Sequence, residues 1–161
     1  MPRSGWILTC FFLAISAPLL AQPIPRSEVK PSLLLTIRDA GPKPYEVTRL
    51  EPTVALTLAE GEAPHPRSTG GEEFRWQGTI NILLPGKYRF DAVLLGELSV
   101  KIGTTEVFQA ASPGGTTAQA KTIRGQEVEL TPGIQPFEAT FRRTGPATRV
   151  ELHWSGPGFQ T

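Results

Sequence analysis

Residues 74–90 read FRWQGTINILLPGKYRF, and the spacing of apolar residues in this stretch decides the fold class. Apolar side chains occupy alternate positions before and after the break at Pro85-Gly86-Lys87. They are Phe74, Trp76, Ile80, Ile82 and Leu84, then Tyr88, Phe90, Ala92 and Leu94. Because successive side chains of a strand point to opposite faces, this pattern predicts a β-hairpin with one apolar face.

The rest of the chain also reads as short strands separated by Gly and Pro turns. Sixteen Pro and 16 Gly in 161 residues weigh against long helices. Further strands are expected within residues 33–38, 54–58, 98–102, 107–108, 128–130, 137–141 and 150–154. A turn is expected at Leu95-Gly96-Glu97, a polar loop at 60–71 and a small-residue loop at 110–120. The fold class is therefore all-β, an antiparallel sandwich or barrel.

Aromatic residues fall on the apolar phase of these strands. They are Phe74, Trp76, Tyr88, Phe90, Phe137, Phe141 and Trp154. Trp76 and Trp154 could instead stack on a sugar ring, but their apolar same-face neighbours favour a place in the core.

The N-terminus has the pattern of a secretory signal peptide over residues 1–21. Arg3 gives the positive n-region, residues 6–20 the apolar region, and Ala21 a small residue at the cleavage position. The alternative is a membrane anchor, but the run is short for a span of about 20 residues and Pro18 interrupts it. Residues 22–31 are expected to form a flexible Pro-rich leader, 32–158 the β-domain and 159–161 a tail.

Cysteine content and charge exclude several classes of protein. Cys10 is the only cysteine and lies in the signal segment, so the cleaved chain would have no disulfide, thiol nucleophile or haem attachment site. Removing Arg3 leaves 15 basic residues (16 minus 1) against 15 acidic residues. A neutral domain gives no electrostatic reason to expect nucleic acid as a partner.

The order of motifs resembles the protective-antigen (PA14) domain, a β-sandwich of bacterial toxins, glycosidases, adhesins and envelope proteins. The matching positions are Phe74, Trp76 and Gly78, then Gly86, Tyr88 and Phe90, then residues 100–103, residues 130–133, Phe137, Phe141, Leu152 and Trp154. The likeness covers residues 32–158. Residues 52–67 add a narrower likeness to copies that stand beside cytochrome-type modules in large exported bacterial proteins.

The chain departs from the sugar-binding members of that family at the calcium site. Those members hold Ca²⁺ with an adjacent Asp-Asp pair, which suits a cation that needs 6–8 oxygen ligands. Asp39 and Asp91 are the only aspartates here, and Ile102 is followed directly by Gly103 where the family often has Ile-Asp-Gly. The calcium mechanism therefore does not transfer, and we expect neither a metal nor a cofactor.

Two polar segments are candidates for ligand binding. The loop at 60–71 carries Glu62, His65 and Arg67 and could recognise an anion or a polar ligand. Arg142 and Arg143 precede the Thr144-Gly145-Pro146 turn and could contact an acidic polysaccharide. For each segment the alternative is a solvated connection with no ligand.

No catalytic motif is found. Glycoside hydrolysis needs two carboxylates around a cleft, and the pairs Glu72-Glu73 and Glu127/Glu129 are no more than polar strand positions. There is no Gly-x-Ser-x-Gly elbow. We therefore expect a non-catalytic secreted or cell-envelope module that binds carbohydrate, as the resemblance implies. The alternative is a structural spacer or a protein-interaction domain of the envelope with no small-molecule site.

Overall fold

The computed structural model describes residues 32–112 and 114–160, and that part of the chain is built from antiparallel strands. The strands are β1 (Leu33–Asp39), β2 (Tyr45–Glu51), β3 (Ala55–Leu58), β4 (Glu73–Ile82), β5 (Gly86–Ile102), β6 (Thr105–Ser112), β7 (Lys121–Leu130), β8 (Gly133–Arg142), β9 (Thr148–Gly156) and β10 (Phe159–Gln160). A short 3₁₀ helix, η2, spans Thr117–Gln119. The all-β prediction is confirmed, while the predicted signal peptide and leader lie outside the described residues.

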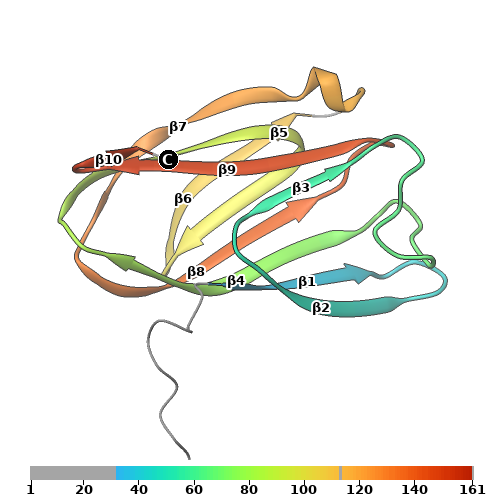
Figure 1. Ribbon diagram of the computed structural model, residues 1–161, viewed down its shortest axis with the longest axis horizontal. Helices are drawn as coiled ribbons and strands as arrows, with labels where there is room; N and C mark the ends of the chain where they lie inside the picture. Colours follow the sequence, from blue (N-terminus) through green and yellow to red (C-terminus); the bar gives the residue numbers. More distant parts are fainter. Residues whose placement is uncertain (1–31, 113, 161) are drawn as a thin grey trace, which may run out of the picture.

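The strands form two layers packed face to face (Figure 1). The lower sheet has the order β2-β1-β4-β8-β5-β6. The upper sheet has the order β7-β5-β9, with β3 and β10 paired to β9. Because β5 takes part in both layers, the molecule is one hydrogen-bonded sheet folded into a sandwich.

Strand β5 passes from the upper to the lower sheet at Gly96. Up to Leu95 it pairs with β7 and β9, and from Gly96 onward with β6 and β8. Gly96 has φ 136°, and a Cβ there would lie 2.3 Å from Cζ of Phe141, so only glycine fits. The predicted turn at Leu95-Gly96-Glu97 is therefore wrong: the glycine bends a strand that continues.

The predicted hairpin of residues 74–94 is also wrong. Strand β4 pairs with β1 and β8, and none of the pairs of β5 is with β4. The segment Leu83-Leu84-Pro85 carries the chain from one sheet to the other. Apolar and polar side chains alternate in both β4 and β5, because each sheet buries one face. Alternation therefore predicted both strands but could not identify their partners.

Three other segments differ from the prediction. Strand β6 continues to Ser112 and η2 follows, so only part of residues 110–120 is a loop. Strand β2 was not predicted, because most of its side chains are exposed and leave no apolar alternation. At the C-terminus, Phe159 and Gln160 pair with β9, although we assigned them to the tail.

The core lies between the two sheets. Its buried aromatic residues, among those described, are Tyr45, Phe74, Trp76, Tyr88, Phe90, Phe108, Phe137 and Phe141. Trp154 is partly buried beside it and stacks on Phe90, with ring centroids 5.9 Å apart, and on Tyr88, at 5.8 Å. This packing directs the polar side chains of the lower sheet outward.

Candidate functional site

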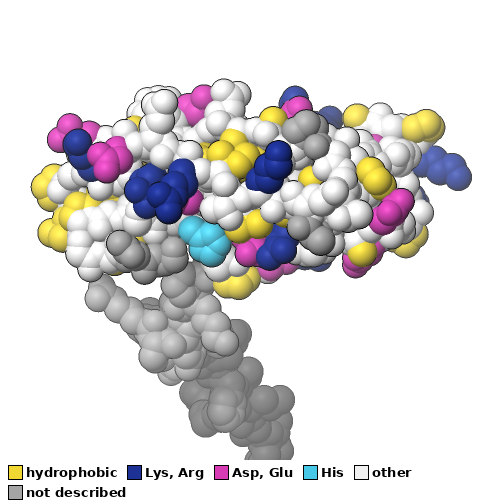
Figure 2. Space-filling view, turned by 90° about the horizontal axis from the view of Figure 1, so that it is seen from above, with side chains coloured by type: hydrophobic (Ala, Val, Ile, Leu, Met, Phe, Trp, Pro, Cys, Tyr) yellow, Lys and Arg dark blue, Asp and Glu magenta, His cyan; other side chains and the backbone are white. Residues whose placement is uncertain are grey.

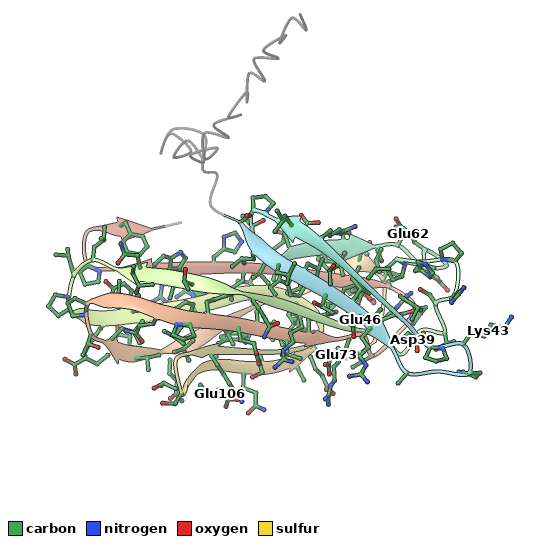
Figure 3. All side chains as sticks on the ribbon, turned by 90° about the horizontal axis from the view of Figure 1, so that it is seen from below. Asp39, Lys43, Glu46, Glu62, Glu73 and Glu106 are labelled. Carbon is green, nitrogen blue, oxygen red and sulfur yellow. The ribbon has the colours of Figure 1, made fainter. Side chains whose placement is uncertain are left out.

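The outer face of the lower sheet carries rows of polar side chains across its strands. The strand registers place Arg38, Glu73, Arg142 and Glu97 in one line, with charges of alternating sign. The next two rows are Thr36, Arg75, Thr140, Ser99 and Gln109, then Leu34, Gln77, Glu138, Lys101 and Glu106. Figure 3 shows Glu73 and Glu106 on this face, seen from below.

A groove of about 610 Å³ is hollowed into this face over β5, β6 and β8. The side chains around it are Glu97, Ser99, Lys101, Glu106, Gln109, Glu138, Thr140 and Arg142, with Leu98, Ala110 and Ala111 completing the lining. Of the predicted ligand-binding residues, only Arg142 lies here. We refer to this hollow as the polar groove.

Some polar groups in the polar groove already have partners. Arg142 Nε lies 3.0 Å from Glu73 Oε2, and Arg75 Nη2 lies 2.7 Å from Glu138 Oε2. The hydroxyl of Ser99 donates to Glu106 Oε2 at 3.1 Å. These bonds fix the positions of three carboxylates, those of Glu73, Glu138 and Glu106, and each carboxylate can still accept further hydrogen bonds.

Other groups in the polar groove have no partner. Within the described part of the chain, no hydrogen bond or ion pair involves the side chains of Glu97, Lys101, Gln109 or Thr140. They provide an acceptor, an ammonium donor, an amide and a hydroxyl across three strands. Such a set can bind a ligand with several hydroxyl groups, because each hydroxyl both donates and accepts. None of the described residues lining the groove is aromatic, so it offers no stacking platform.

Glu97, Ser99, Lys101, Gln109 and Thr140 were not predicted as site residues. The alternation of Glu97, Ser99 and Lys101 with buried Leu98, Val100 and Ile102 does mark them as outward-facing. No feature of the sequence indicates that β6 and β8 lie beside them and form a hollow.

The other predicted ligand-binding residues gather at one end of the sandwich, which we call the loop end. It consists of the β1–β2 turn, the connection 59–72 and the β8–β9 turn (Figure 1). Figure 3 shows Asp39, Lys43 and Glu62 toward this end. Most polar groups here hold the loops to one another, as the contacts of Arg143 and Asp39 show.

Arg143 joins the connection 59–72 to the β8–β9 turn. Its side chain is 6% exposed and ion-pairs with Glu72, which is fully buried, at 3.5 Å. Its Nε donates to the carbonyl oxygen of Gly145 at 3.0 Å, and Nη2 donates to those of Glu62, at 3.2 Å, and Pro146. These bonds direct the guanidinium of Arg143 toward other parts of the fold and away from a ligand in solvent.

His65 and Arg67 lie on the outside of the same end. The His65 ring stacks on Tyr45 with centroids 4.3 Å apart, and its Nδ1 accepts the backbone N–H of Arg67 at 3.1 Å. The Arg67 side chain is exposed, and Glu62 Oε2 accepts the backbone N–H of Ala59 at 2.9 Å. Arg67 and Glu62 are both exposed, but only the Arg67 side chain is without a hydrogen bond or ion pair in the described residues.

Asp39 and Tyr45 fix the β1–β2 turn to the same connection. Asp39 accepts the N–H of Gly41 at 2.8 Å and both the N–H and the hydroxyl of Thr69 at 2.8 Å, and these bonds lower its pKa below 3.8. Burial raises the pKa of Tyr45 above 10.0, with its hydroxyl 3.1 Å from that of Ser68. Both groups therefore hold the loops in place.

The described residues offer no evident metal centre. In residues 32–112 and 114–160, no three His, Cys, Asp or Glu side chains are grouped to hold a metal ion. Asp91, the second aspartate of the chain, lies 3.2 Å from Arg89 Nε and accepts the N–H of Gly125 at 3.2 Å. Glu127 and Glu129 are exposed on β7, outside the polar groove, and Glu127 pairs with Lys87 at 3.3 Å.

The fold is that of PA14-like domains. A PA14 sugar-binding domain from an RTX adhesin superposes with a TM-score of 0.62 at 13% identity, over 81% of this chain and 93% of that one. The Epa9A adhesin domain of Candida glabrata, solved in complex with Galβ1-4GlcNAc, gives 0.58 at 10% identity, over 86% and 87%. An anti-sigma factor domain-containing protein from Clostridium clariflavum gives 0.61 at 18% identity, over 88% of this chain.

These likenesses establish the class of fold. No protein-family model matches the sequence, and no curated protein does. The chain spans about half, 49%, of the length of the anti-sigma factor domain-containing protein. No helix in the described residues has the length and apolar composition needed to span a membrane. The narrower likeness to copies beside cytochrome-type modules stays a prediction.

Proposed function

We propose that this chain is a non-catalytic, exported binding module, and that its polar groove binds an uncharged carbohydrate without calcium. The observation that carries the proposal is the set of unpartnered groups on Glu97, Lys101, Gln109 and Thr140 in one hollow. Because carboxylates and cations both line the groove, a ligand with hydroxyl groups and no net charge suits it best. Two proteins of similar fold support this class of ligand: one is titled a sugar-binding domain, and the other was solved with a disaccharide.

Independence from calcium rests on the state of the two aspartates. Asp39 and Asp91 both accept hydrogen bonds from the fold, and neither has an adjacent aspartate. Calcium needs several oxygen ligands at once, which these separated carboxylates do not supply. We therefore expect binding to be the same in EDTA as in calcium.

A glycan array with the chain beginning at Gln22, which keeps every strand of the sandwich, tests the proposal. Binding of neutral glycans that persists in EDTA is the expected result. Binding that EDTA abolishes would point to a metal site instead. If Arg67→Ala abolishes binding while Lys101→Met does not, the site is at the loop end.

The alternative function is a spacer or protein-interaction domain of the envelope. It is favoured by the ion pairs already formed across the lower sheet and by the lack of an aromatic side chain in the polar groove. Absence of binding across a broad neutral glycan panel, from a chain with a cooperative unfolding transition, would support this alternative.

A further inference from the structure

The end of the sandwich opposite the loop end exposes large apolar side chains. Leu83 is 76% exposed and Leu84 51%, in the connection from β4 to β5, and Ile134 is 73% exposed near the start of β8. The register pairs Asn81 with Ile134, so Ile134 lies beside the end of β4. We call these three residues the apolar tip, and Figure 2 shows hydrophobic side chains at this end. Gathered apolar side chains mark interaction sites, unlike single scattered ones.

The apolar tip is held in place by three turns packed together. The Tyr88 hydroxyl donates to the carbonyl oxygen of Leu84 at 2.6 Å. A Cβ at Gly86 would lie 2.8 Å from Cγ of Pro157, so the β9–β10 turn lies close against the β4–β5 connection. Gln135 Nε2 donates to the carbonyl oxygen of Thr131 at 2.9 Å and braces the β7–β8 turn. The leucines are therefore presented outward by a braced structure.

Size argues against a rigid protein partner. The three turns lie together at one end of the sandwich (Figure 1). A stable protein interface buries about 800 Å² on each side, whereas a patch of three side chains amounts to a few hundred Å² at most. A second copy of the chain would bury too little. A lipid bilayer surrounds a protruding side chain on all sides and needs no matching surface.

The charges behind the apolar tip indicate which lipid surface fits. Lys87 follows the connection, and its Nζ lies 3.3 Å from Glu127 Oε2. Glu129, also exposed, stands opposite Lys87 in the register. Together, the one cation and the two carboxylates of Lys87, Glu127 and Glu129 carry a net charge of one negative unit, which an anionic membrane would repel.

We propose that the apolar tip inserts into the interfacial region of a zwitterionic lipid bilayer, with Lys87 remaining at the headgroup level. Burying Leu83, Leu84 and Ile134 supplies the attraction, and the long stem of Lys87 allows its ammonium to stay in water. This inference is independent of the proposed carbohydrate site, which lies on the outer face of the lower sheet.

Co-sedimentation with phosphatidylcholine vesicles tests this inference, using the chain that begins at Gln22. The Leu83→Ser/Leu84→Ser/Ile134→Ser variant should lose at least about tenfold in vesicle affinity. The matched control is Leu34→Ser/Leu50→Ser, an exposed apolar pair on β1 and β2, which should bind like the wild type. The wild type should bind less well to vesicles enriched in phosphatidylserine.

Three results would overturn the inference. They are no binding of the wild type to phosphatidylcholine, equal binding by the triple variant, and stronger binding to phosphatidylserine. Sedimentation velocity tests for one more contradicting result. A dimer that the triple variant abolishes would mean that the apolar tip binds a second copy of the chain and not a bilayer. Thermal unfolding of each variant checks that the fold is retained, as expected for exposed positions.

Discussion

The loop end and the polar groove both gather charged side chains, but the fold uses them differently. At the loop end, Arg143 is 6% exposed and all its contacts are to loops that it holds together. In the polar groove, the side chains of Lys101 and Glu97 are exposed and make no hydrogen bond or ion pair within the described residues. Buried polar groups with several partners stabilise a fold, whereas unpartnered groups in a hollow are available to a ligand.

The largest effect should come from breaking the buried ion pair of the loop end. Arg143→Met leaves the Glu72 carboxylate buried and without its cation, so the free energy of unfolding should fall by about 3–5 kcal/mol. Urea unfolding measures this change. The matched control is Arg142→Met, whose ion pair with Glu73 is exposed and should cost no more than about 1 kcal/mol. Equal losses in the two variants would remove the distinction between the loop end and the groove.

A smaller effect should follow from Asp39 at the same end, and it should depend on pH. The native state holds the pKa of Asp39 below 3.8, so the ionised carboxylate stabilises the fold above that pH. This stabilisation is lost as the pH falls through the lowered pKa. Asp39→Asn should therefore melt at a lower temperature than the wild type at pH 6, and the difference should shrink toward pH 2. A difference that does not change with pH would contradict this assignment.

A still smaller effect is expected from the exposed ion pair at the margin of the polar groove. A double-mutant cycle with Arg75→Met and Glu138→Gln should give a coupling energy of about 0.2–1 kcal/mol, because solvent screens the pair. Chemical denaturation of the four proteins measures it. A coupling near that of the Glu72–Arg143 pair would show that the groove is also part of the structural framework.

The smallest effect on stability should come from the unpartnered groups themselves. The Glu97→Gln/Lys101→Met/Thr140→Val variant should unfold within about 0.5 kcal/mol per substitution of the wild type, since no bond is lost. Chemical denaturation checks this against Glu129→Gln/Lys121→Met/Thr122→Val, the same changes on exposed positions of β7. A large loss in the groove variant alone would mean that these side chains support the fold.

The sequence predicted the strands better than their pairing. The alternation around Trp76 and Phe90 was enough to predict strands with one buried face, because burial of one face is a property of each strand alone. Pairing depends on where the chain crosses between layers. The sequence does not mark Leu83-Leu84-Pro85 as such a crossing, nor Gly96 as a bend within a continuous strand.

The candidate site was less predictable for a similar reason. Arg142 stands out in the sequence because it adjoins a turn, whereas Lys101 and Thr140 look like ordinary outward-facing strand positions. They become neighbours only when β5 and β8 pair, through contacts between residues about forty positions apart. Likewise, nothing local to Glu72 and Arg143 shows that they are buried together.

The most direct test of the central claim is calorimetric titration of the best neutral glycan from the array into matched variants. We predict that the wild type and the β7 control bind equally, with and without EDTA, while the Glu97→Gln/Lys101→Met/Thr140→Val variant loses at least about tenfold in affinity, as expected when several hydrogen bonds are removed. Unchanged affinity in a groove variant that folds normally would contradict the assignment of the ligand to the polar groove.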